Sequence, residues 1–211
     1  MKIIITGCLS LFIFAAFAFT SQSPHGSHEE AKTLAIGDPM PGGDMKMVDV
    51  NGTEQVPLST HMGENGLLVV FSCNTCPFVV AYEDRLPEIQ AMAKKMDIGF
   101  VVVNSNEAKR KEDDSEKAMK EYTKKWRLDS PYLIDTDSKV ADLFGAFVTP
   151  EVFLFNPDSK LEYKGAIDDN WKSKDAVEVD YLQIAMTAVI NGDEIEVKET
   201  KARGCSIKRL K

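Results

Sequence analysis

A short and mostly apolar run at positions 67–72 leads directly into two cysteines, Cys73 and Cys76, and then into Pro77. A short apolar run of this kind is typical of a strand that is buried on both faces. After the cysteines, apolar residues recur at helical spacing, and proline suits a first helical turn because the N–H that it lacks would have no partner there. The stretch therefore predicts a buried strand followed by a helix, which Pro87 should kink or split.

The rest of the chain alternates strand-like and helix-like segments. Asn51-Gly52 lies between two strand-like segments and is a strong hairpin signal. Further strands are expected at residues 98–106, 131–135, 151–156 and 161–167, and further helices at 112–128, 137–145 and 181–190. This order predicts an α/β fold, with a central mixed sheet flanked by helices and an N-terminal hairpin extension.

The two ends of the chain carry different signals. Residues 1–20 hold a lysine followed by a nearly unbroken apolar run, which is the layout of a signal peptide; the run is also long enough to be an uncleaved anchor. Polar residues 21–37 indicate a linker, residues 38–200 the folded domain, and residues 201–211 a C-terminal tail with Cys205. We therefore expect a periplasmic or secreted protein, which touches a membrane only through its N-terminal segment if that segment is uncleaved.

Composition excludes some functions. The formal net charge of −8 argues against a nucleic-acid partner, because phosphate binding needs a basic face. Zinc needs about four ligands, and this chain offers one cysteine pair, a distant Cys205 and three histidines, two of them in the linker. We predict no metal and no other cofactor, with a copper- or zinc-binding protein as the less favoured alternative. The paired acids Asp168-Asp169 are expected in an exposed turn rather than in a cation site.

A Cys-X-X-Cys pair at the start of a helix suits disulfide exchange. The unpaired N–H groups and the positive dipole end of the helix favour a thiolate at Cys73 and lower its pKa. The thiolate is the attacking species in exchange, and Cys76, one turn further on, can release a mixed disulfide by attacking within the molecule. We expect Cys73 to be the nucleophile and Cys76 the resolving thiol. An inert disulfide is the alternative, but so small a ring constrains the unfolded chain little.

The sequence resembles the thioredoxin superfamily, specifically the extracytoplasmic thioredoxin-like proteins near the AhpC/TSA (redoxin) and TlpA/ResA groups. The motifs FSCNTCPF and VTPEVFLF and the strand-turn-strand-helix ending carry this resemblance, which covers about residues 34–200. It implies a thioredoxin-like fold in which the Thr149–Pro150 bond is cis, Pro150 packs against the cysteine pair, and the backbone of Thr149 pairs with a substrate strand. Two positions depart from the pattern: Ser72 replaces the usual aromatic residue, and Leu67 replaces the buried acid of thioredoxins.

The activity implied is that of a thiol-disulfide oxidoreductase, which exchanges disulfides with partner proteins and takes electrons from a thiol donor. A peroxiredoxin-like peroxidase is the alternative, with Cys76 reacting with peroxide. In peroxiredoxins a threonine or serine and a proline precede that cysteine, and the matching positions here are Cys73 and Val69. No arginine stands at an obvious matching place, and Arg85 and Arg127 remain candidates for the arginine that such a site needs. Cys205 could bond another chain, serve as a third redox thiol or be unreactive; GCSIKRL around it resembles the tail of a redoxin-like subgroup.

Overall fold

The computed structural model describes residues 33–210, which belong to one compact unit. The predicted signal peptide, residues 1–20, and residues 21–32 of the predicted linker lie outside the described residues. Within residues 33–210, none of the helices combines the length and the apolar character that crossing a membrane would require.

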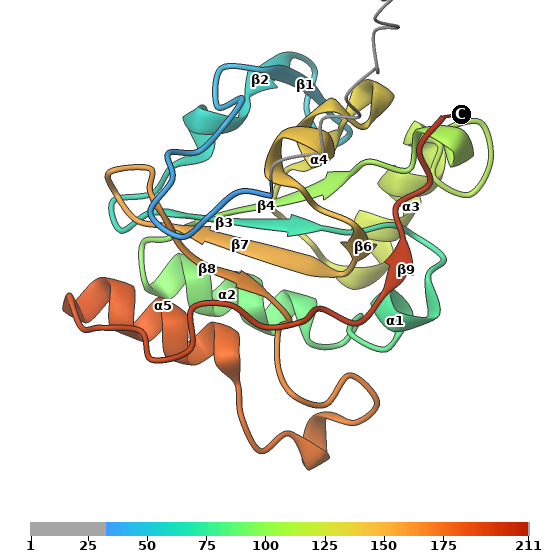
Figure 1. The fold of residues 1–211 in the computed structure, drawn as a ribbon. Coiled ribbons are helices and arrows are strands. Elements are labelled where there is room, and N and C mark those ends of the chain that lie inside the picture. Colours follow the sequence, from blue (N-terminus) through green and yellow to red (C-terminus); the bar gives the residue numbers. More distant parts are fainter. Residues whose placement is uncertain (1–32, 211) are drawn as a thin grey trace, which may run out of the picture. The chain divides into compact units, whose positions relative to one another are not determined.

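The core of the fold is a seven-stranded mixed sheet in the order β2-β1-β5-β4-β3-β7-β8 (Figure 1). β3 pairs in parallel with β4, and β4 with β5, while the other neighbours are antiparallel. The strands are β1 (Lys46–Asp49), β2 (Gln55–Pro57), β3 (Leu67–Phe71), β4 (Gly99–Asn104), β5 (Tyr132–Ile134), β7 (Glu151–Phe155) and β8 (Leu161–Gly165). The predicted mixed sheet and the hairpin β1–β2 are confirmed.

The central position of β3 explains its sequence. All five of its residues are buried, because β4 lies on one side, β7 on the other, and helices cover both faces. β3 and β7 are antiparallel, so Phe71 at the end of β3 lies opposite Glu151 at the start of β7. The residues that follow β3 are therefore brought next to those that precede β7, namely Thr149 and Pro150.

Helices cover the two faces of the sheet unequally (Figure 1). One face packs on α1 (Pro77–Val80), α2 (Leu86–Lys95), α3 (Glu116–Trp126) and α5 (Tyr181–Asn191), and the other on α4 (Lys139–Phe144). Short 3₁₀ turns complete the set: η1 (Leu58–His61), η2 (Glu107–Lys109), η3 (Thr136–Ser138) and η4 (Lys174–Ala176). Helices on both faces are what the alternation of segments predicts.

Proline and capping residues set the helix boundaries. Pro87 lies in the first turn of α2 and separates it from α1, so the predicted split is confirmed. Asp180 caps α5 by accepting a hydrogen bond from Gln183 N at 3.0 Å, and Gly192, with φ +71°, ends that helix. At α4 the N-cap residue is Ser138, but its side chain makes no capping bond. The carboxylate of Asp135 instead accepts from Val140 N and Ala141 N, both at 2.9 Å.

A second, two-stranded sheet was not predicted. β6 (Val148–Thr149) pairs antiparallel with β9 (Cys205–Ser206), with Thr149 opposite Cys205. In Figure 1 the red C-terminal segment runs past β8 and brings β9 beside β6 and α1. The C-terminal tail therefore lies on the edge of the fold where β3 ends.

Candidate active site

Cys73 lies in the loop that joins β3 to α1, and its side chain is only 3% exposed. It is the free cysteine among the described residues. Its Sγ lies 3.2 Å from the hydroxyl Oγ1 of Thr149, close enough for a hydrogen bond. The antiparallel pairing of β3 with β7 makes this contact possible, because it places the end of one strand beside the start of the other.

Asn74 fixes the loop between the two cysteines. Its backbone N–H donates to Asp114 Oδ1 at 2.9 Å, and its side-chain Nδ2 donates to the carbonyl of Asp113 at 2.7 Å. The hydroxyl of Tyr132 donates to Asn74 Oδ1 at 3.0 Å. Asp114 is 1% exposed and also accepts from Asn104 Nδ2 at 2.8 Å. A buried polar network thus sets the position of the Cys-Asn-Thr-Cys loop.

The pKa of Cys73 is raised from its ordinary value, mainly because burial disfavours the thiolate. The hydrogen bond with Thr149 and backbone N–H groups at Cys76 and Thr75 act in the opposite direction, while the charge of Asp114 adds to the rise. The sequence predicts a lowered pKa, and for this structure that prediction is wrong. α1 is only four residues long and begins at Pro77, so its dipole is too small and too distant to outweigh desolvation.

Cys76 forms a disulfide with Cys205, which is 129 positions further along the chain. The sequence predicts a bond between Cys73 and Cys76, and the structure instead holds Cys73 as a thiol beside a bonded Cys76. Cys76 Sγ lies 3.3 Å from the carbonyl oxygen of Thr149. We refer to the Cys76–Cys205 bond below as the tail disulfide.

Thr149 and Pro150 lie against both cysteines. The Thr149–Pro150 peptide bond is cis, as the resemblance implies. Thr149 is 1% exposed; its hydroxyl contacts Cys73, its carbonyl lies by Cys76, and its backbone pairs with Cys205. The structure therefore gathers all the proposed site residues, since Pro77, the first residue of α1, follows Cys76 directly.

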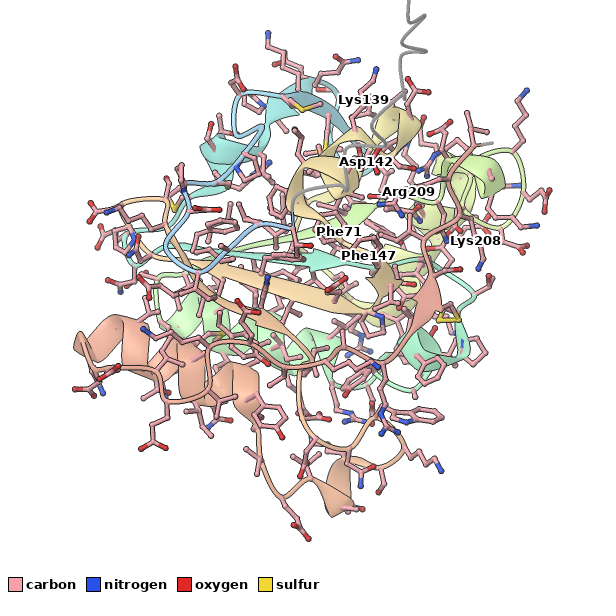
Figure 2. The ribbon with its side chains drawn as sticks, in the orientation of Figure 1. Phe71, Lys139, Asp142, Phe147, Lys208 and Arg209 are labelled. Atoms are coloured by element: carbon pink, nitrogen blue, oxygen red, sulfur yellow. A yellow bond between two sulfur atoms is a disulfide. The ribbon has the colours of Figure 1, made fainter. Side chains whose placement is uncertain are left out.

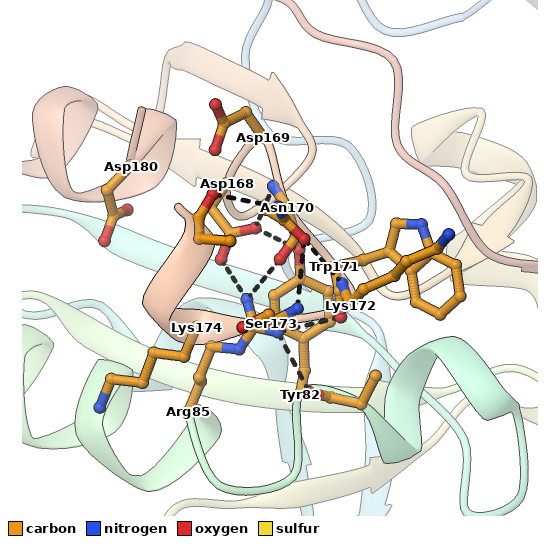
Figure 3. Close-up of polar contacts among 12 residues, drawn as sticks. Tyr82, Arg85, Asp168, Asp169, Asn170, Trp171, Lys172, Ser173, Lys174 and Asp180 are labelled. Carbon is orange, nitrogen blue, oxygen red and sulfur yellow. Dashed lines mark hydrogen bonds and ion pairs between the residues drawn. The ribbon is translucent and has the colours of Figure 1, made fainter. Parts of the chain in front are cut away.

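A buried ion pair lies beside this site (Figure 3). Arg85 Nη1 is 2.6 Å from Asp168 Oδ2, and Tyr82 donates to Asp168 Oδ1 at 2.7 Å. Burial, followed by the hydrogen bond to Asp168, raises the pKa of Tyr82. Asp168 is 6% exposed, so the prediction of an exposed turn is wrong for this residue, although it holds for Asp169.

The ion pair also decides the role of Arg85. Besides Asp168, its guanidinium donates to the carbonyls of Ala81, Asn170 and Trp171, so it is committed to holding this loop rather than to Cys76. A cavity of about 250 Å³ borders the same region and is lined in part by Pro150, Asp168, Trp171 and Arg203. Asp114 was not singled out from the sequence, because it stands in the charged run KEDDSEK, which looks exposed.

Within residues 33–210 no three side chains of histidine, cysteine, aspartate or glutamate come together as a metal site would require. The candidate site consists of the three cysteines, Thr149, the cis proline Pro150 and the buried polar network that binds Asn74.

Residues 36–164 match the model of the AhpC/TSA family. An uncharacterised conserved protein from Geobacillus kaustophilus is similar in structure, with a TM-score of 0.77 and 27% identity over 85% of this chain and 94% of that chain. A hypothetical protein from Sinorhizobium meliloti 1021 has a TM-score of 0.76 and 27% identity, over 84% of this chain and 96% of that chain. A thioredoxin-like protein in its oxidised form has a TM-score of 0.56 and 19% identity, over 75% of this chain and 97% of that chain. A search of curated proteins found no match. The fold is thioredoxin-like, as predicted.

Proposed function

The chain belongs to the AhpC/TSA family and is a redox enzyme, and from this premise we propose that it is a thiol-disulfide oxidoreductase that exchanges disulfides with partner proteins. The observation that carries the proposal is the meeting of a thiol and a disulfide at one residue. Cys73 Sγ and Cys76 Sγ lie 3.2 and 3.3 Å from the hydroxyl and the carbonyl of Thr149. Both sulfur atoms contact Thr149 and lie just after the carboxyl end of β3. This position suits disulfide exchange better than a purely structural disulfide.

In the reducing direction, a thiol donor first reduces the tail disulfide, and Cys73 and Cys76 are then both thiols. The Cys73 thiolate attacks a disulfide of the partner protein and forms a mixed disulfide, while the partner's first sulfur leaves as a thiolate and takes a proton. Cys76 then attacks Cys73 Sγ, so that the Cys73–Cys76 bond forms and the partner's second sulfur leaves. Two electrons pass to the partner, and the thiol donor restores the dithiol.

Thr149 has two roles in this reaction. Its hydroxyl can donate to the Cys73 thiolate, which opposes the cost of burying the charge. Its backbone forms the strand edge on which β9 lies in the structure and on which a partner segment would lie during exchange. Pro150 follows Thr149 through the cis peptide bond, and Pro77 begins α1 directly after Cys76.

The proposal includes export from the cytoplasm. Two features support it: the apolar run at the N-terminus has the layout of a signal peptide, and a disulfide such as Cys76–Cys205 persists mainly in oxidising compartments. Cell fractionation with N-terminal sequencing of the purified protein tests it. A chain that retains residue 1 and is found in the cytoplasmic fraction would contradict export.

Reduction of insulin disulfides by the full chain, with dithiothreitol as electron donor, tests the exchange activity. We expect Cys73→Ser to abolish the catalysed rate, because no nucleophile remains. Ser72→Ala is a matched control: this neighbouring hydroxyl is buried and has no hydrogen-bond partner among the described residues, so its loss should leave the rate unchanged. Full activity in Cys73→Ser would overturn the assignment.

Peroxidase chemistry at Cys76 is a second candidate, and the tail disulfide is the observation that favours it. A peroxide would oxidise the Cys76 thiolate to a sulfenic acid, and condensation with the Cys205 thiol would release water and form this bond. Arg85, however, is committed to Asp168. Consumption of hydrogen peroxide in Cys73→Ser, lost in Cys76→Ser, would favour the peroxidase over the oxidoreductase.

A further inference from the structure

The C-terminal tail reaches the site along a defined route. Residues 198–200 run beside β8, where Thr200 N donates to Lys164 O at 3.1 Å. β9 then pairs with β6, and Ile207 N donates to Phe147 O at 2.9 Å. In Figure 2 Lys208 and Arg209 lie on the side of the molecule that carries Asp142 and Phe147. Arg209 Nε is 2.7 Å from Asp142 Oδ1.

The tail occupies the edge of β6, which adjoins the cysteines. β9 is the ladder partner of β6 in the two-stranded sheet, and Cys205 lies opposite Thr149. Cys205 therefore belongs to an extended segment that pairs with Thr149, and from that position it bonds to Cys76. Tail residues Lys201 and Arg203 also form part of the wall of the 250 Å³ cavity beside Pro150.

Gly204 is fitted closely to this edge. A Cβ at this position would lie 2.3 Å from the carbonyl oxygen of Thr149 and 2.7 Å from its carbonyl carbon. Backbone atoms cannot rotate away as the end of a side chain can, so any larger residue would push β9 off β6. The residue before the bonded cysteine must therefore be glycine for the tail to lie as it does.

We propose that Cys205 is a third exchange thiol and that the tail is an internal substrate, which Cys73 releases by attacking Cys76. The Cys73 thiol loses its proton, its sulfur bonds to Cys76 Sγ, the Cys76–Cys205 bond breaks, and Cys205 leaves as a thiolate and takes a proton. One disulfide replaces another, so no electrons enter or leave and no further reactant is needed. The product is the Cys73–Cys76 disulfide that the sequence predicts.

Release of the tail frees the edge of β6 at Val148 and Thr149. This step rests on the proposed function and deepens it, because the tail shows which segment the edge accepts. The partner segment should be extended, carry a cysteine opposite Thr149, and have glycine immediately before that cysteine. The tail remains tethered by residues 198–200, so its local concentration stays high and closure is reversible.

The two disulfide isomers can be counted by alkylation. The full chain is oxidised, incubated at pH 8, quenched with acid and labelled with N-ethylmaleimide, and each cysteine is read by peptide mapping. The closed isomer has the Cys76–Cys205 bond and is labelled at Cys73. The open isomer has the Cys73–Cys76 bond and is labelled at Cys205. In the unmodified chain we expect label at Cys205 to grow with time as label at Cys73 falls by the same amount.

Gly204→Ala and Ser206→Ala form a matched pair on either side of Cys205. Gly204→Ala should raise the ratio of open to closed isomer about tenfold, equivalent to about 1.4 kcal/mol. Ser206→Ala removes an exposed hydroxyl and keeps the backbone pairing, so the ratio should stay within about twofold of that of the unmodified chain. In Cys73→Ser, Cys205 should stay bonded and unlabelled.

Three results would overturn the proposal: no label at Cys205 in the unmodified chain, an unchanged ratio in Gly204→Ala, or equal labelling of Cys205 in Cys73→Ser. Insulin reduction separates this proposal from the proposed function. Interconverting isomers in a chain that never reduces insulin would refute the oxidoreductase and leave the internal exchange standing. Insulin reduction by a chain whose Cys205 never takes label would refute only the internal exchange.

Discussion

Among residues 33–210, the hydroxyl of Thr149 is the one side-chain group within hydrogen-bond distance of Cys73 Sγ. Thr149→Val removes that hydroxyl and nearly preserves the volume and branching of the side chain. The backbone of residue 149 still pairs with Cys205, so the mutation tests the contact with Cys73 while leaving the tail in place. We expect the pKa of Cys73, already raised by burial, to rise further.

The size of this rise follows from the free energy of one hydrogen bond. A hydrogen bond to a charged group contributes about 1.5–3 kcal/mol, and about 1.4 kcal/mol corresponds to one pKa unit, so the full effect would be about one to two units. The backbone N–H groups of Thr75 and Cys76 also lower the pKa of Cys73 and remain in the mutant. We therefore expect the lower end, a rise of about one unit.

The pKa can be read by NMR from the Cβ shift of Cys73 in oxidised protein labelled at cysteine Cβ with ¹³C, followed in the isomer that retains the tail disulfide and the free Cys73 thiol. Alkylation of Cys73 at pH 8 should slow about tenfold in the same mutant, because one pKa unit changes the thiolate fraction about tenfold. Thr149→Ser keeps a hydroxyl, so the pKa and the alkylation rate of Cys73 should stay close to those of the unmodified protein. If the Val and Ser variants had equal pKa values, the contact with Thr149 would not stabilise the thiolate, and our account of the site would be refuted.

Two further predictions concern stability. Asp168→Ala leaves the buried charge of Arg85 without a partner, which should lower the free energy of unfolding by about 3–5 kcal/mol and Tm by about 10 °C. Asp169→Ala, on the exposed neighbour, should cost less than about 1 kcal/mol, and equal losses in a thermal melt would contradict a special role for the pair. Reduction of the tail disulfide, which closes a loop across 129 positions, should lower the free energy of unfolding by up to about 5 kcal/mol in urea titrations. Cys73→Ser retains the tail disulfide and has no thiol at residue 73 to exchange with it, so reduction should destabilise this variant at least as much as the unmodified chain.

The elements of the main sheet could be predicted because each carries a local signal. β3 is a continuous apolar run, Asn51-Gly52 marks the hairpin between β1 and β2, and Pro87 marks the break before α2. These signals arise from burial and from backbone restrictions that act over a few residues. β6 and β9 have two residues each, and a segment that short has no periodicity to detect.

The residues of the candidate site could be predicted from the sequence, but the disulfide that two of them form could not. The motifs singled out Cys73, Cys76 and Thr149, and the structure brings them together. Which two of three cysteines bond is a tertiary fact, set here by the route of the tail along β8 and β6. The direction of the pKa shift at Cys73 was also out of reach, because burial depends on what covers the thiol, and the sequence shows only that a helix follows it.

The raised pKa of Cys73 sets the pH dependence of the internal exchange. Only the closed isomer has a thiol at Cys73, because the open isomer holds this sulfur in the Cys73–Cys76 disulfide. Burial favours the protonated thiol in the closed isomer, so the thiolate that attacks Cys76 is a minor species at neutral pH. The thiolate fraction grows about tenfold with each unit of pH until the pKa of Cys73 is reached. Alkaline pH should therefore speed the release of the tail by internal exchange.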